Sequence, residues 1–273
     1  GYNMAINKKS IIELIFDHCE KNNNYVFDNE LIKKIVMDSG SKTNPYDMTK
    51  IDHISKLPKI LLDNDYAIAH IGSGKHMFVK GISKIYHKFE SIKENEIEKW
   101  AYVPSILNDY SISESSVLSL CFNQRIMHDF LYKDVSCSPK MYNSERKRGI
   151  KFSYKIGDIP MKFENLQIEI DLTIEMNGKV TVFEGKNTKN SYEWIDNFNI
   201  YQLYSPFRYY HELKEKNRLD INEISACYLI RQRKDNGSYV RLYNYTFKDP
   251  LDITSIKVLK KREYRVLREL DEN

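Results

Sequence analysis

The Asn177-Gly178 dipeptide constrains the fold of this 273-residue chain more than any other short segment. It lies between two runs in which apolar and polar residues alternate, over about residues 166–175 and 179–186. Asn-Gly in that setting is the strongest short-range signal for a two-residue β-hairpin turn, because a type I′ turn needs positive φ angles at both positions. We therefore expect two antiparallel strands whose residues pair outward from this turn.

Charged residues occur in both predicted strands, at the ends that are distant from the turn. The first strand carries Glu169 and Asp171, and the second carries Glu184 and Lys186. Because side chains alternate along a strand, Glu169 and Asp171 share one face, and Glu184 and Lys186 share one face. Counting outward from the turn places Glu184 opposite Asp171 or the residue after it. The hairpin is thus expected to bring two carboxylates together with a lysine beside them.

Carboxylate and carbonyl oxygens are the ligands that Mg²⁺ prefers in proteins. Asp171, Glu184 and the backbone carbonyl of Gly185 are therefore candidate Mg²⁺ ligands. Lys186 is placed to orient or deprotonate an attacking water and to offset charge on a phosphate. The alternative is structural, because exposed cross-strand ion pairs of these residue types are common and contribute well under about 1 kcal/mol.

The elements around this hairpin predict a mixed domain over residues 111–273. Strands that alternate with helices indicate an α/β (α+β) class. The segment from Lys133 to Pro160 is basic and polar, and we expect it to be an irregular, DNA-facing insertion. The expected elements are a helix from Ser113 through Leu131, a helix over 191–216, strands over 223–231 and 238–246, and a basic helix from Thr254 to Leu270.

Residues 4–82 predict a separate unit of three helices and a hairpin, joined to the rest by a connector over 83–110. The helices are expected at Lys8 to Lys21, at Phe27 to Met37 with Asp28 as N-cap, and at Thr49 to Asp63. Pro58 predicts a kink or a break in the third helix. Three helices followed by a two-stranded ribbon is the order of a winged helix, which usually binds DNA. A small helical protein-interaction module is the alternative.

Composition limits the class of protein. The net charge is only +4, with basic clusters at 140–151, 231–234 and 257–268 and with 20 tyrosines, which suits phosphate contact but is also typical of solvated surface. The four cysteines form no CxxC pair and have no histidine at zinc spacing, so we expect no zinc site. No apolar stretch approaches the length of a bilayer span, and no signal-peptide pattern is present, so we expect no membrane contact and a cytoplasmic location.

The order of these residues resembles the PD-(D/E)XK nucleases. The resemblance covers about residues 110–245 and rests on Gln167 to Asp171, the hairpin, Val182 to Asn187, and the helix that contains Asn199 to Tyr210. Within that superfamily the chain looks most like the type II restriction endonucleases. The proline of the motif is absent, since Ile170 precedes Asp171.

The resemblance implies a role for each residue of the predicted site. Asp171 and Glu184 would hold Mg²⁺, and Lys186 would be the catalytic lysine. Glu114, at the start of the preceding helix, matches the position of an additional acidic residue that aids metal binding, although glutamate is also favoured there by the helix dipole. Gln202 would hydrogen-bond within the site or to the DNA backbone, or would only pack on the sheet.

Two other residues have two possible roles each. Glu169 would either support the metal site or be a solvated partner of a lysine. Arg208 would either contact phosphate or pair with an acid. The third N-terminal helix and two basic segments would contact bases, with arginine and lysine suited to guanine, and asparagine and glutamine to adenine. The DNA-binding candidates in these segments are Asn143, Arg146, Lys147, Arg148, Arg231, Gln232 and Arg233.

The resemblance therefore implies a Mg²⁺-dependent endonuclease that cleaves double-stranded DNA at a specific site in a prokaryotic cell, leaving a 5′-phosphate and a 3′-hydroxyl. A palindromic site would favour a homodimer, because two-fold symmetry in the protein matches two-fold symmetry in the DNA. Two alternatives are a non-catalytic winged-helix DNA-binding regulator and a repair-type or modification-dependent nuclease of the same superfamily.

Overall fold

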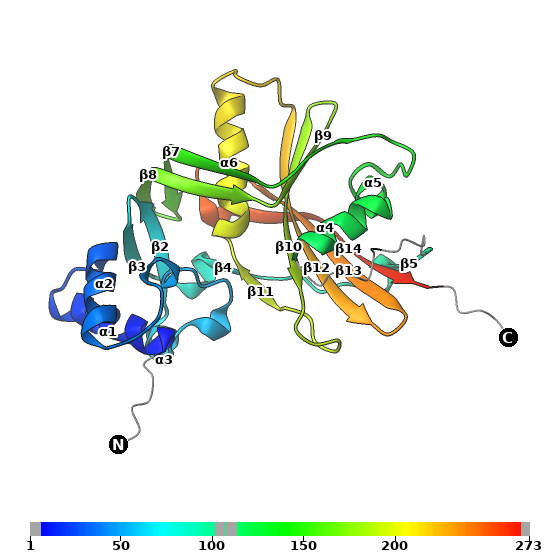
Figure 1. Ribbon diagram of the computed structural model, residues 1–273. Helices are drawn as coiled ribbons and strands as arrows, with labels where there is room; N and C mark the ends of the chain where they lie inside the picture. Colours follow the sequence, from blue (N-terminus) through cyan, green and yellow to red (C-terminus); the bar gives the residue numbers. More distant parts are fainter. Residues whose placement is uncertain (1–6, 102–106, 108–113, 269–273) are drawn as a thin grey trace.

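The computed structural model describes residues 7–101, 107 and 114–268 of the chain. It is a mixed α and β structure built on a seven-stranded sheet of order β5-β14-β13-β12-β10-β9-β6 (Figure 1). Most neighbours are antiparallel, but β10 runs parallel to β12, and β14 runs parallel to β5. The strands are β5 (Ile97–Ala101), β6 (Lys140–Tyr142), β9 (Leu172–Met176), β10 (Lys179–Asn187), β12 (Glu223–Lys234), β13 (Gly237–Phe247) and β14 (Ile256–Leu267).

Helices cover both faces of this sheet. Helix α6 (Tyr201–Glu215) lies on one face, and α4 (Glu114–Asn123) and α5 (Ile126–Tyr132) lie on the other (Figure 1). Strand β10 shows why both faces are covered: Val180 and Val182 belong to the core on the α6 side, whereas Phe183 belongs to the core on the α4 side. Alternation along the strand therefore delivers apolar side chains to two separate cores.

The N-terminal unit (residues 7–81) contains α1 (Lys8–Lys21), β1 (Val26–Asp28), α2 (Asn29–Asp38), α3 (Lys59–Asn64), β2 (Tyr66–Gly72) and β3 (Lys75–Lys80). The predicted first two helices and the hairpin are confirmed. The Asp28 carboxylate accepts a hydrogen bond from the Leu31 N–H at 2.9 Å, which confirms the predicted N-cap. The helix predicted from Thr49 to Asp63 is wrong before Pro58, where only a 3₁₀ turn (Ile54–Lys56) forms, and α3 begins after Pro58, so that the expected break is present.

The prediction of an irregular segment from Lys133 to Pro160 is wrong over most of its length. Strand β7 (Glu145–Ile156) forms a long hairpin with β8 (Ile159–Ile170), and short β6 precedes it. Phe152, Tyr154 and Ile156 are buried, while the residues between them are exposed. The alternation was hard to recognise because lysine and arginine occupy most of the exposed positions.

Three other predicted elements differ from the structure. The C-terminal basic helix is strand β14, in which Tyr264 and Val266 are buried, and most of its basic residues are partly buried, three of them in ion pairs with Glu96, Glu98 and Glu263. The helix predicted from residue 191 begins only at Tyr201, after a loop and the short strand β11 (Asn197–Asn199), which pairs with β4 (Tyr86–Lys88). The helix predicted through Leu131 is divided at Arg125, whose φ angle is 59°.

The N-terminal unit packs closely against the rest of the molecule. Its strands continue into a five-stranded sheet of order β1-β3-β2-β8-β7, and in Figure 1 the β7–β8 hairpin reaches from the central sheet to β2. The Tyr154 hydroxyl donates to the carbonyl of His70 and lies 2.6 Å from the Tyr201 hydroxyl, which links β7, β2 and α6. Because the N-terminal unit packs in this way, the segment before α3 lies against the end of β10. Among the described residues, no helix is both long and apolar enough to span a membrane.

Candidate active site

Asp171 lies at the point where the chain passes from one sheet to the other. The strand predicted over 166–175 is broken here, since Ile170 still pairs with β7 whereas Leu172 pairs with Phe183 of β10. One step beyond that last pair, Glu184 falls opposite Asp171. The spatial pairing expected from counting outward along the hairpin is thus confirmed.

The Asp171 carboxylate is half-buried against β10. Its Oδ2 accepts a hydrogen bond from the Gly185 N–H at 3.2 Å. Burial raises the pKa of Asp171 above its usual value, and the Gly185 N–H and a hydrogen bond with Glu184 offset this rise only in part. Two carboxyl groups in contact in a partly desolvated place favour either a shared proton or a bound cation.

A chain of amide and hydroxyl groups supports Glu184. The Gln202 side-chain amide, in the first turn of α6, donates to Glu184 Oε1 at 3.4 Å. The Tyr228 hydroxyl on β12 donates in turn to Gln202 Oε1 at 3.3 Å. Of the roles considered for Gln202, hydrogen bonding within the site is the one that this geometry shows.

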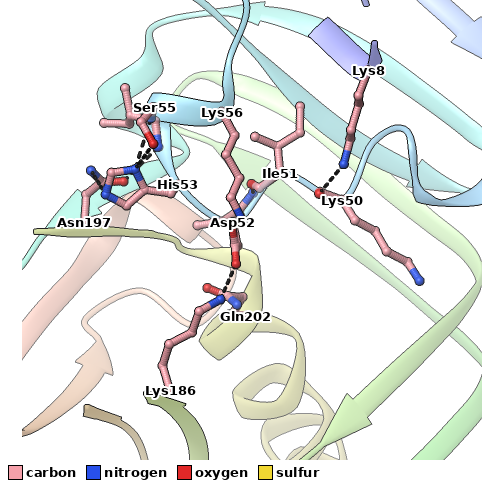
Figure 2. A network of polar contacts seen from close by, with 12 residues as sticks. Lys8, Lys50, Ile51, Asp52, His53, Ser55, Lys56, Lys186, Asn197 and Gln202 are labelled. Carbon is pink, nitrogen blue, oxygen red and sulfur yellow. Dashed lines mark hydrogen bonds and ion pairs between the residues drawn. The ribbon is translucent and has the colours of Figure 1, made fainter. Parts of the chain in front are cut away.

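Lys186 contacts a carboxylate from the N-terminal unit. Its ammonium group forms an ion pair with Asp52 Oδ2, and Asp52 Oδ1 also accepts from Lys56 at 2.6 Å (Figure 2). Burial alone would raise the pKa of Asp52, but the hydrogen bonds from Lys186 and Lys56 outweigh it and lower the pKa to about 2. The carboxylate is therefore ionised at neutral pH. Sequence reasoning missed Asp52, which lies 134 positions from Lys186.

A cavity of about 570 Å³ opens beside Lys186, between the segment that carries Asp52 and the loop after β10. Its walls are joined by hydrogen bonds: His53 Nε2 lies 2.6 Å from Asp196 Oδ1, and the Ile54 N–H donates to Asn197 Oδ1 at 2.9 Å. The lining residues are Asp52, His53, Ser55, Lys56, Lys186, Asn187, Thr188, Lys189, Asn190, Glu193, Trp194, Ile195, Asp196, Asn197 and Tyr228.

A family model described as "Domain of unknown function (DUF6997)" matches residues 81–265, which is more than half of the 273-residue chain. The chain belongs to the DUF6997 family. A second model, "Domain of unknown function (DUF6996)", matches residues 8–78. No curated protein and no solved structure matches the chain. The ion pair between Asp52 and Lys186 therefore joins the DUF6996 region to the DUF6997 region.

The donor set in the DUF6997 region fits a Mg²⁺ ion. Asp171 and Glu184 offer two carboxylates, and the carbonyl of Gly185 offers a third oxygen on the same stretch of β10. Mg²⁺ usually takes one or two protein carboxylates and completes its shell with water and substrate phosphate. Within the described residues no group of three or more His, Cys, Asp or Glu side chains is gathered for a metal. Helix α4 begins at Glu114, whose side chain lies outside the described residues, as do Ser111 to Ser113.

Glu169 is exposed on β8, and its charge contributes to raising the pKa of Asp171. It forms an ion pair with Arg146 of β7 at 3.2 Å, so its partner is an arginine where a lysine was considered. Lys147 on the same strand pairs with Glu145 at 2.6 Å. Arg148 and Asn143 are exposed. Of the β7 candidates, Arg146 and Arg148 are exposed, whereas Lys147 is partly buried.

The arginines predicted on α6 and β12 have different surroundings. Arg208 is 4% exposed and pairs with Glu212 at 2.7 Å, so pairing with an acid is the alternative that the structure shows. Arg231 is fully buried, and its Nε donates to Ser238 Oγ at 2.9 Å. Gln232 is also buried, whereas Arg233 is exposed. Only Arg233 of this group presents its side chain to solvent.

Proposed function

We propose that this protein is a Mg²⁺-dependent endonuclease that cleaves double-stranded DNA at a specific site, in the manner of the PD-(D/E)XK type II restriction endonucleases. The observation that carries the proposal is the placement of Asp171 against Glu184 across β9 and β10, with Lys186 on the same strand beside an open cavity. Paired acids followed by a lysine are the groups that metal-assisted phosphodiester hydrolysis needs.

The order of elements supports the same assignment. Helix α4, the antiparallel pair β9 and β10, helix α6, and strand β12 parallel to β10 form a mixed sheet with helices on both faces. That arrangement agrees with the strand-hairpin-strand-helix core of the nucleases that the sequence resembles. The candidate residues occupy the ends of β8 and β10 and the start of α6, which is the placement that the resemblance implies.

The N-terminal unit supports a winged-helix assignment through its topology. Its elements run α1-β1-α2-α3-β2-β3, and its strands pair in the order β1-β3-β2. Helix α3 is only six residues long, and the hairpin turn is held to β8, where Ser73 Oγ donates to the Glu164 carbonyl at 3.2 Å. We therefore propose that the exposed basic face of β7 is the main DNA contact and that the N-terminal unit supplements it.

Mechanistically, Asp171, Glu184 and the Gly185 carbonyl would hold Mg²⁺, which supplies Lewis-acid polarisation of the phosphate. The Lys186 ammonium donates a hydrogen bond to the attacking water or to a phosphate oxygen, and it offsets the charge that develops on phosphorus. Gln202 keeps the Glu184 carboxylate in place. In-line attack by water breaks the bond from phosphorus to the 3′-oxygen and leaves a 5′-phosphate and a 3′-hydroxyl.

Plasmid digestion tests this proposal. We expect discrete bands with Mg²⁺, no cleavage in EDTA, and a loss of roughly 10²- to 10⁴-fold in rate for Lys186→Ala. Lys189→Ala is the matched control, because Lys189 is an exposed lysine on the rim of the same cavity. Shifted but intact DNA under all conditions would instead identify a non-catalytic regulator. A smear without bands would identify a repair-type nuclease.

A homodimer is part of the same proposal, since a palindromic site is matched by two-fold protein symmetry. Light scattering after size exclusion, with and without a DNA fragment that the protein cleaves, measures the assembly directly. A single copy bound to that fragment throughout the concentration range of cleavage would contradict the dimer but not the nuclease.

A further inference from the structure

The partner of Lys186 in the ion pair comes from outside the DUF6997 region. Both side chains of the Asp52–Lys186 pair are 25% exposed, so the pair is shielded from water on most sides. Figure 2 shows Asp52 approaching from the N-terminal segment while Lys186 rises from the end of β10, with Gln202 beside them. The N-terminal unit therefore contributes a charged side chain to the candidate active site.

The backbone that carries Asp52 is held by buried groups. The Ile51 carbonyl accepts hydrogen bonds from the Tyr86 hydroxyl at 2.8 Å and from the Asn199 side-chain amide at 3.0 Å. The Asn199 N–H also donates to the Asp52 carbonyl at 3.2 Å. Ile51, Tyr86 and Asn199 are each less than 9% exposed. Asp52 is thus fixed in position by β4 and by the segment that leads into α6, rather than lying on a mobile surface.

The ion pair decides where the Lys186 side chain is held. The Asp52 carboxylate fixes it at the end of β10, where it lines the cavity. An ion-paired ammonium at that place can donate hydrogen bonds and stabilise negative charge as it develops. The geometry therefore fits a role for Lys186 in orientation and charge stabilisation.

We propose that Asp52 is a positioning residue of the active site, whose ion pair holds the Lys186 side chain at the cavity on the strand that carries Glu184, so that docking of the N-terminal unit completes the catalytic centre. The proposal rests on the proposed nuclease function. It also makes cleavage depend on a contact between the two family regions, because neither region alone contains both partners.

The test compares Asp52→Asn with Asp63→Asn in the full-length protein. Asp63 is the matched control, because it pairs with Lys59 at 2.6 Å in the same unit but on the exposed surface of α3. We expect Asp52→Asn to lower kcat for plasmid cleavage roughly 10- to 100-fold, the usual effect of losing a group that orients an active-site residue. DNA affinity, measured by fluorescence anisotropy with Ca²⁺ in place of Mg²⁺, should change less than about twofold.

Rescue by a conservative variant separates positioning from a general structural role. Asp52→Glu, which keeps a carboxylate that can pair with Lys186, should recover part of kcat, whereas Asp52→Asn should not. Circular dichroism and thermal unfolding show whether each variant is folded. If Asp52→Asn does not fold, Asp52→Ala replaces it in the test, and a wild-type kcat for folded Asp52→Ala overturns the proposal.

The possible outcomes are distinct. Equal kcat for Asp52→Asn and Asp63→Asn, with an active wild type, would overturn the positioning role and leave the nuclease proposal intact. Faster cleavage by Asp52→Asn would also overturn the positioning role, because it would mean that the contact restrains Lys186. A wild type that cleaves no DNA with Mg²⁺ or Mn²⁺ would refute the nuclease function itself and, with it, the role of Asp52.

Discussion

Replacing Arg208 with alanine distinguishes a structural arginine from a DNA contact. The Arg208 guanidinium is surrounded by protein: Nε pairs with Glu212 at 2.7 Å, Nη1 donates to the Tyr204 hydroxyl at 3.1 Å, and the group lies 4.6 Å from the centre of the Phe152 ring. With 4% of the residue exposed, a phosphate has no access to this charge. We expect Arg208→Ala to destabilise the protein and to leave DNA affinity unchanged.

The magnitude follows from the three contacts. Breaking a fully buried ion pair costs about 3–5 kcal/mol, and the cost is lower here because water can solvate Glu212, whose side chain is 25% exposed. The cation–π contact contributes about 1 kcal/mol. The Tyr204 hydroxyl still donates to the Pro250 carbonyl at 2.8 Å, so it loses an acceptor role only. We expect a total loss of about 3 kcal/mol, which corresponds to a Tm lower by roughly 6–10 °C.

Thermal unfolding and DNA-binding anisotropy in Ca²⁺ measure the two effects separately. Arg218→Ala is the control, because Arg218 lies just beyond the same helix and is exposed. We expect the control to leave Tm within about 1 °C of the wild type, as is usual for exposed residues. A stable Arg208→Ala protein with a DNA affinity reduced severalfold would refute the reasoning, since it would show that the guanidinium reaches phosphate.

Two further predictions concern the N-terminal unit and its contact with β8. Gly72→Ala should destabilise the protein by about 2 kcal/mol more than Gly149→Ala, because both sites have positive φ (83° and 68°) but only at Gly72 would a methyl group overlap the Glu164 carbonyl; equal denaturation midpoints would contradict this. Burial lowers the pKa of His70 to about 3 and of His76 to about 4, so the unfolded chain binds more protons and stability should fall below pH 6.5, by up to about 1.4 kcal/mol per pH unit for each histidine. Thermal unfolding between pH 7 and 5 checks this, and His76→Asn should show the shallower dependence.

Local patterns predicted the centre of the candidate site well. The Asn177-Gly178 turn determines the pairing of β9 with β10, so the approach of Glu184 to Asp171 follows from counting residues. The first two helices and the N-terminal hairpin were predictable for the same reason, because their apolar periodicity and capping residues act within a few positions of each other.

Patterns failed where charged residues cover the exposed face of a strand. Strand β7 carries lysine and arginine at most of its exposed positions, and β14 contains several partly buried basic residues, so that their composition indicates a loop and a helix. Hydrogen bonding to neighbouring strands decides these segments, and those neighbours are distant in sequence: β14 pairs with β13 and with β5. The prediction that Arg231 contacts DNA failed for a related reason. A basic cluster in the sequence does not reveal which of its side chains the sheet buries.

The sequence by itself thus determined the two acids, the lysine and their order on a hairpin, because a tight turn converts spacing along the chain into proximity. Only the tertiary structure decided what surrounds them. The break at Asp171 arises where two sheets diverge, and the contact between Asp52 and Lys186 arises because buried groups on β4 and before α6 hold the Asp52 backbone against β10. Such contacts depend on how whole surfaces pack, which no local pattern of residues encodes.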